Sequence, residues 1–160
     1  MMSTTGEQTM GRVTEKVCVQ NFMDVAKFEA GEIGWDHVRT VEIDAIVDTG
    51  TTHLSLPPAA IQQLGLLFLT SRPVRTSAGA VERRIYGGAE ITVRDRTVQM
   101  SVMEEEETRP ARLGHVVLGL LDFVVDPKSQ RLIPNPEHGG RWMADLYFVN
   151  NRQTAATICP

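Results

Sequence analysis

The stretch Val41-Glu42-Ile43-Asp44-Ala45-Ile46-Val47-Asp48-Thr49-Gly50 decides how this chain is interpreted. Apolar side chains occupy every second position up to Val47, which is the period of a β-strand with one buried face. Asp48 follows directly on this strand, and Gly50 can donate its N–H without side-chain hindrance. The stretch therefore predicts a rigid strand that ends on a firmly held, partly desolvated carboxylate.

An ordinary β-turn is the alternative explanation of Asp48-Thr49-Gly50. Asp and Gly are both favoured in turns, where Asp bonds its own backbone. Taken alone, the tripeptide favours the turn over a catalytic carboxylate. Other motifs in the sequence are therefore needed to distinguish the two interpretations.

The segments on either side of this stretch are mostly short strands with turn residues between them. One helix is predicted at Pro58–Leu64, with Ser55 as its cap and Gly65 as a left-handed terminator. A second short helix is expected around Met23–Ala30. Strands and hairpins are predicted at Val13–Gln20, at Val74–Ile85 with a turn at Ser77–Ala80, at Glu90–Met103 with a turn at Arg94–Arg96, and on both sides of the turn Asp126–Ser129.

Three motifs in order resemble the retropepsin-like, or clan AA, aspartic protease family, particularly its small bacterial members. The first is the apolar strand that runs into Asp48-Thr49-Gly50. The second is a glycine-containing hairpin, Val74–Ile85, at the distance expected for a flap. The third is Val117-Leu118-Gly119, interpreted as the apolar-apolar-Gly motif that closes a ψ-shaped loop before a short helix. The resemblance covers about residues 12–136.

This resemblance implies a homodimer in which Asp48 faces Asp48 of a second copy, because family members carry one Asp-Thr-Gly per chain. The two carboxylates would share one proton and activate a water molecule. Thr49 would stiffen the pair across the dimer axis, and Gly50 would offer its backbone to the substrate and to the carboxylate. The expected site comprises the catalytic residues Asp48, Thr49 and Gly50, and the substrate-binding residues Thr51, Thr52, His53, Ser77, Ala78, Gly79, Ala80, Leu118 and Gly119.

The chain also departs from the retroviral pattern. Thr51 stands where Ala is usual, and its hydroxyl can bond the Asp48 carboxylate. The Asp and Arg that pair in retroviral members are replaced by Thr52 and, on the interpretation above, Leu120. The acidic run Glu104–Glu107 is expected to be a solvated loop, with an acidic recognition patch as the alternative.

Composition excludes several other classes. The formal net charge is −4 and the pI about 5.6, which does not suit a nucleic-acid partner. No apolar run has the length of a membrane helix, and the first residues lack a signal-peptide pattern, so a cytoplasmic protein is expected. Neither cysteine spacing nor histidine spacing indicates a disulfide framework or a metal site, and no cofactor is expected.

The sequence thus predicts an all-β, retropepsin-like closed barrel with a flap hairpin and one or two short helices, one lobe per subunit. Residues 1–10 are expected to be a disordered tail, 11–138 the domain, and 139–160 a C-terminal extension. Val13–Gln20 and Leu146–Val149 are the candidate dimer strands. The predicted function is aspartic endopeptidase action on extended peptides by a homodimer. The alternative is a non-catalytic dimeric module that binds peptides or proteins on the same fold.

Overall fold

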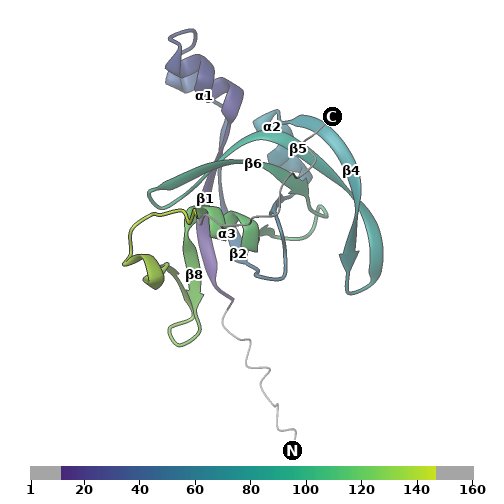
Figure 1. Ribbon diagram of the computed structural model, residues 1–160. Helices are drawn as coiled ribbons and strands as arrows, with labels where there is room; N and C mark the ends of the chain where they lie inside the picture. Colours follow the sequence, from purple (N-terminus) through teal and green to yellow (C-terminus); the bar gives the residue numbers. More distant parts are fainter. Residues whose placement is uncertain (1–11, 147–160) are drawn as a thin grey trace, which may run out of the picture.

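The computed structural model describes residues 12–146, which fold around one closed barrel (Figure 1). The strands pair in the order β1-β2-β7-β3-β6-β5-β4, and β1 also pairs with β5, so six strands close on themselves and β4 extends beyond β5. The predicted all-β class and closed barrel are confirmed. The strands are β1 (Thr14–Asn21), β2 (Thr40–Val47), β3 (Leu54–Leu56), β4 (Leu67–Thr76), β5 (Gly79–Val93), β6 (Arg96–Glu104) and β7 (Ala111–Leu113).

Three short α-helices, two 3-10 helices (Trp35–His37 and Pro136–His138) and a separate hairpin complete the described chain, where one or two helices were predicted. The α-helices are α1 (Phe22–Glu29), α2 (Pro58–Leu64) and α3 (His115–Leu121), and the hairpin joins β8 (Phe123–Asp126) to β9 (Arg131–Pro134). Helix α1 projects from the barrel between β1 and β2, whereas α3 lies against it (Figure 1). Within residues 12–146, no helix is long and apolar enough to cross a lipid bilayer.

The core fills the inside of the barrel with side chains from nearly every strand. Alternation is clearest in β5, where Ile85, Ala89, Ile91 and Val93 are buried. Fully buried leucines from β3, α2, β7 and α3 pack against them. Burial on this scale makes the barrel a rigid frame, from which the loop after β2 projects.

The two predicted hairpins are confirmed, and their strands are longer than expected. Strands β4 and β5 pair from Leu67 to Gly87, and β5 and β6 pair as far as Val93 and Arg96. Helix α2 has the predicted bounds and ends on Gly65 with φ +61°. Its predicted cap was wrong, because Ser55 lies in β3 and Pro57 holds the capping position.

The segment Val116–Gly119 was expected to be an apolar stretch that closes a loop ahead of a short helix, and this was wrong. Those residues lie inside α3 itself, with Val117, Leu118 and Leu121 on its buried face. A short run of apolar residues does not distinguish a helix from an extended segment by periodicity alone. The loop before α3 therefore has to be closed by residues that come earlier in the chain.

A polar cluster at the end of α3 fixes the segment that follows β9. The Asp122 carboxylate accepts hydrogen bonds from Asn135 Nδ2 (3.0 Å), His138 Nδ1 (2.7 Å) and the Met143 N–H (3.1 Å). Burial alone would raise the pKa of Asp122, but these hydrogen bonds outweigh it and lower the pKa. His138 Nε2 lies 3.2 Å from Asp145 Oδ1, and contact with the two carboxylates raises the pKa of His138.

Of the two candidate dimer strands, the structure describes one fully and the other only at its first residue. Strand β1 pairs with β2 from Thr14 to Gln20 and with β5 from Val17 to Asn21, so most of both its edges is already used within the subunit. The other candidate, Leu146–Val149, lies outside the described residues except for Leu146, and the predicted tail 1–10 lies outside them entirely.

Candidate active site

Asp48 lies where β2 leaves the barrel, and the backbone around it is held from two sides. Its N–H donates to the Leu113 carbonyl at 3.0 Å, and its own carbonyl accepts from the Thr51 N–H at 3.1 Å. The second of these contacts closes a turn over Asp48-Thr49-Gly50. The turn and the functional interpretation of this tripeptide are therefore compatible, because the turn is what fixes the carboxylate.

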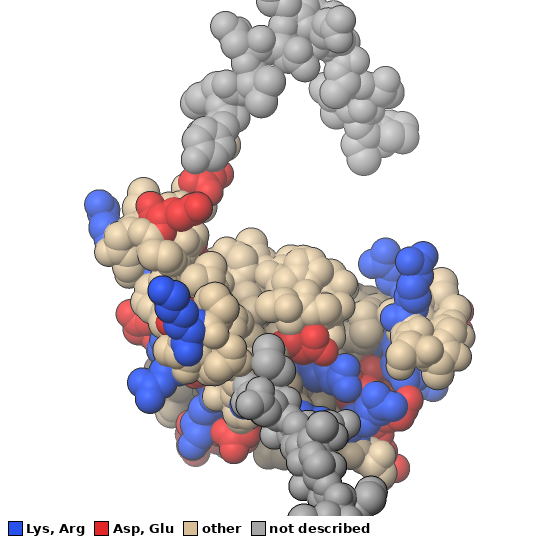
Figure 2. Space-filling model, turned by 90° about the horizontal axis from the view of Figure 1, so that it is seen from below, with Lys and Arg blue, Asp and Glu red and all other residues tan. Residues whose placement is uncertain are grey.

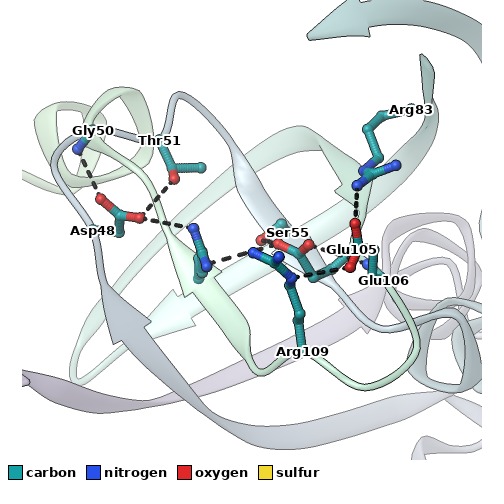
Figure 3. Close-up of polar contacts among 9 residues, drawn as sticks. Asp48, Gly50, Thr51, Ser55, Arg83, Glu105, Glu106 and Arg109 are labelled. Atoms are coloured by element: carbon teal, nitrogen blue, oxygen red, sulfur yellow. Dashed lines mark hydrogen bonds and ion pairs between the residues drawn. The ribbon is translucent and has the colours of Figure 1, made fainter. Parts of the chain in front are cut away.

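The Asp48 carboxylate accepts three hydrogen bonds, which divide unequally between its two oxygens (Figure 3). The Gly50 N–H donates to Oδ1 at 2.9 Å. The Thr51 hydroxyl and Arg112 Nη1 both donate to Oδ2, at 3.0 Å and 3.2 Å. The predicted contacts from Gly50 and Thr51 are thus present. Oδ1, with one donor, retains more capacity for a further hydrogen bond than Oδ2.

Arg112 is a site residue that the sequence analysis missed. It lies in β7, which runs parallel to β2 and places Arg112 opposite Ile46. Its neighbours Ala111 and Leu113 are buried, so the alternation of the strand turns Arg112 away from the core and toward Asp48. The Asp48 and Arg112 side chains are each about one third exposed, at 32% and 31%, so this charged pair is accessible from solvent.

Glu105 lies on the other side of Arg112 and was also missed. Its Oε2 accepts from the Ser55 hydroxyl at 3.2 Å and lies 3.8 Å from Arg112 Nε. The Glu105 side chain is only 13% exposed, so the prediction of a fully solvated acidic run was wrong at this position. Glu106 is exposed as expected, and it pairs with Arg83 and Arg109 (Figure 3).

Gly114, and not Gly119, closes the loop beside Asp48. A Cβ added to Gly114 would lie 2.4 Å from the His53 carbonyl oxygen and 2.5 Å from that of Thr51. At Gly119 the same Cβ would meet no atom within 4 Å. The apolar residue and glycine of the loop-closing motif are therefore Leu113 and Gly114.

Because the loop-closing glycine is Gly114, a different residue follows it. That residue is His115, and not Leu120. Its N–H donates to the Thr51 carbonyl at 2.7 Å, and its ring Nδ1 lies 2.9 Å from the same oxygen. The Val116 N–H donates to the Thr52 carbonyl at 3.2 Å. The start of α3 thereby holds the backbone of the Asp48 loop.

His53 is a half-buried residue of the loop that follows Asp48. Burial, and then the charge of Arg72 in β4, lower the pKa of His53, which favours its neutral form. Among the residues that the structure describes, its buried Nδ1 has no hydrogen-bond partner. The half-burial of His53 differs from a fully solvated loop histidine, the alternative to its predicted place in the substrate site, and that predicted contact with substrate stays a prediction.

The remaining predicted site residues are spread over several elements. Thr49 and Thr52 are exposed in the Asp48 loop, and Ser77, Ala78, Gly79 and Ala80 are exposed at the tip of the β4–β5 hairpin. Leu118 and Gly119 lie within α3, outside the loop-closing position they were assigned. Within residues 12–146, no group of three or more His, Cys, Asp or Glu side chains is arranged to hold a metal ion.

Comparison with known protein families matches residues 31–121 to a family described as an aspartyl protease. Comparison with curated proteins gave no match. The matched range spans more than half of the chain and contains Asp48, Glu105, Arg112 and Gly114. The chain therefore belongs to the aspartyl protease family, and its closed barrel is of the retropepsin-like type.

Proposed function

We propose that this protein is an aspartic endopeptidase whose single active site forms between the Asp48 carboxylates of two identical subunits. The observation that carries the proposal is the unequal use of the carboxylate oxygens. Among residues 12–146, Oδ2 is engaged by Thr51 and Arg112, whereas Oδ1 has only the Gly50 N–H. The single Asp-Thr-Gly of the chain supplies one carboxylate, so a second copy is needed to supply the other.

The proposed reaction is hydrolysis of a peptide bond by water, without a covalent enzyme intermediate. Two carboxylates in contact share one proton, because they cannot both be ionised at close range. The ionised Asp48 takes a proton from the bound water as the water oxygen attacks the carbonyl carbon. The partner subunit's Asp48 gives its proton to the carbonyl oxygen, which forms a tetrahedral diol. When the C–N bond breaks, the diol returns a proton to one carboxylate and the departing nitrogen takes one from the other.

The rest of the proposed site binds an extended peptide. Gly50 and Thr51 fix the orientation of the carboxylate, and preorganised donors of this kind lower the cost of charge development. The hairpin tip, Ser77–Ala80, closes over the peptide from above, while Thr49, Thr52 and His53 contact it from the Asp48 loop. Leu118 and Gly119 have no place in this arrangement, because both lie within α3.

A cleavage assay with matched variants tests the proposal. Wild-type protein, Asp48→Asn and Asp44→Asn are compared on a peptide library between about pH 3 and pH 8. Asp44 is an exposed residue of β2, so its variant makes the same chemical change on the same strand. The wild type and Asp44→Asn should cleave, and Asp48→Asn should lose cleavage while keeping its fold and oligomeric state.

The opposite result has a clear interpretation. If the folded wild type cleaves nothing, or if Asp48→Asn cleaves as well as Asp44→Asn, the proposed activity is wrong. Peptide binding that survives Asp48→Asn would then favour the non-catalytic binding module.

A further inference from the structure

The guanidinium of Arg112 lies beside the carboxylate on which the proposed reaction takes place. Its Nη1 is 3.2 Å from Asp48 Oδ2. A reacting carbonyl carbon has to approach within about 3–3.5 Å of its attacking water, which itself contacts Asp48. The side chains on either side of the cleaved bond therefore pass within reach of this guanidinium.

We propose that Arg112 is a specificity-determining residue, which makes the enzyme select a peptide with an Asp or Glu side chain next to the cleaved bond. This inference rests on the proposed function, because it assumes that the peptide lies across Asp48. It concerns the class of substrate and does not change how the bond is broken.

Most of the hydrogen-bonding capacity of Arg112 is unused. An arginine side chain carries five N–H donors in a planar fork. Within residues 12–146, the Arg112 side chain makes one hydrogen bond, to Asp48. Its side chain is about one third exposed, so an incoming carboxylate can reach two N–H groups at once. That paired geometry is the strongest contact between arginine and a carboxylate.

Glu105 competes with a substrate carboxylate by its charge and not by a hydrogen bond to Arg112, because both of its oxygens are already engaged elsewhere. Oε2 accepts from Ser55 and Oε1 from the Glu106 N–H. The 3.8 Å separation from Arg112 Nε is too long for a hydrogen bond. Glu105 therefore opposes a substrate carboxylate through its negative charge, without using up the N–H donors of Arg112.

A second cation lies near the same loop. Burial, and then the charge of Arg72 in β4, lower the pKa of His53. No net positive field is needed for this selectivity. The chain carries a net charge of −4, and Figure 2 shows acidic and basic side chains interspersed on the face it presents. Selectivity would therefore come from local contact with Arg112.

The test compares pairs of peptides that the wild type cleaves and that differ only by Glu or Gln at one position flanking the cleaved bond. The measured quantity is the ratio of kcat/KM for the Glu peptide to that for the Gln peptide. A charge-assisted contact in the wild type should favour Glu by about tenfold or more at one flanking position. Arg112→Gln should bring the ratio to about one, while Arg112→Lys should keep part of it.

For a second variant, we expect this ratio to change in the opposite direction. Glu105→Gln removes the competing carboxylate and should raise the Glu-to-Gln ratio above that of the wild type. This measurement keeps the inference testable if Arg112→Gln does not fold.

The outcomes separate the inference from the proposed function. Asp48-dependent cleavage without a Glu preference, or a preference that survives Arg112→Gln, overturns the inference and leaves the protease standing. A lower ratio in Glu105→Gln also overturns it. The absence of Asp48-dependent cleavage overturns the proposed function, and the inference with it.

Discussion

Replacing Gly114 by alanine should destabilise the fold, because the space beside this glycine is filled by the Asp48 loop. The added Cβ would lie 2.4 Å from the His53 carbonyl oxygen and 2.5 Å from both the Thr51 oxygen and the Thr52 carbonyl carbon. All of these are backbone atoms, so none can rotate away. The backbone of Gly114, with φ −85° and ψ 170°, suits any residue. The cost therefore comes from the clash and not from the backbone conformation.

The expected magnitude has two parts. Forcing an extra methyl group into a well-packed site typically costs about 1–3 kcal/mol of the free energy of unfolding. Moving the Asp48 loop away also weakens the hydrogen bonds from the His115 and Val116 N–H groups to that loop, at about 1 kcal/mol each. We therefore expect Gly114→Ala to cost about 3–5 kcal/mol in total.

The matched control is Gly119→Ala in α3. A Cβ at Gly119 meets no atom within 4 Å, and alanine is a better helix former by about 0.8–1 kcal/mol, so this variant should be slightly stabilised. Both variants are compared by urea unfolding at one protein concentration, because the stability of the proposed dimer would depend on concentration. Placing both in an Asp48→Asn background prevents self-cleavage.

The reasoning would be refuted if the two variants did not differ in stability as expected. If Gly119→Ala destabilises the fold as much as Gly114→Ala, or if Gly114→Ala costs less than about 1 kcal/mol, the packing between Gly114 and the Asp48 loop has been misassigned.

Two further predictions concern Thr51 and His138. Thr51→Val removes a hydrogen-bond donor to Asp48 Oδ2 and should lower kcat/KM for peptide cleavage by about tenfold. Thr51→Ser keeps the hydroxyl and should retain activity, so equal activity in the two variants would contradict the role of the hydroxyl. The pKa of His138 is raised from 6.5 by Asp122, so the stability this contact adds is complete below about pH 6.5 and is lost as the pH rises through the raised value. His138→Gln should remove this alkaline decline in the urea midpoint, and an unchanged decline would contradict it.

The parts of the fold that the sequence predicted well depend on local chemistry. Strand β2 alternates between exposed and less exposed residues as far as Ala45, and α2 begins at a proline pair and ends at Gly65. The turn of each long hairpin is marked by polar or small residues. In each case the signal lies within a few neighbouring residues, so a single sequence is sufficient to find it.

The errors in the sequence analysis depend on contacts between distant segments. Leu113-Gly114 and Leu118-Gly119 are both an apolar residue followed by glycine, only five positions apart. What distinguishes them is the backbone of residues 51–53, which packs against Gly114 and is more than 60 positions away. The residues next to either glycine in the sequence do not indicate that packing.

Arg112 and Glu105 were missed for a related reason. Strand β7 has only three residues, Ala111–Leu113, which is too short for alternation to show that Arg112 faces away from the core. Glu105 lies within a run of four glutamates, and its burial follows from the Ser55 hydroxyl fifty residues earlier in the chain. A charged residue between two small or apolar ones, just before the loop-closing glycine, is the signal that could have indicated Arg112.

The central claim is that two Asp48 carboxylates from different subunits form one active site, and a subunit-mixing titration tests it most directly. Wild-type protein is allowed to exchange subunits with increasing amounts of Asp48→Asn at a constant total concentration, and peptide cleavage is measured at each ratio. If both carboxylates are needed, activity should follow the square of the wild-type fraction and fall to about one quarter in an equal mixture. Activity that falls in proportion to the wild-type fraction, to about one half, would show that each subunit works alone and would contradict the shared site.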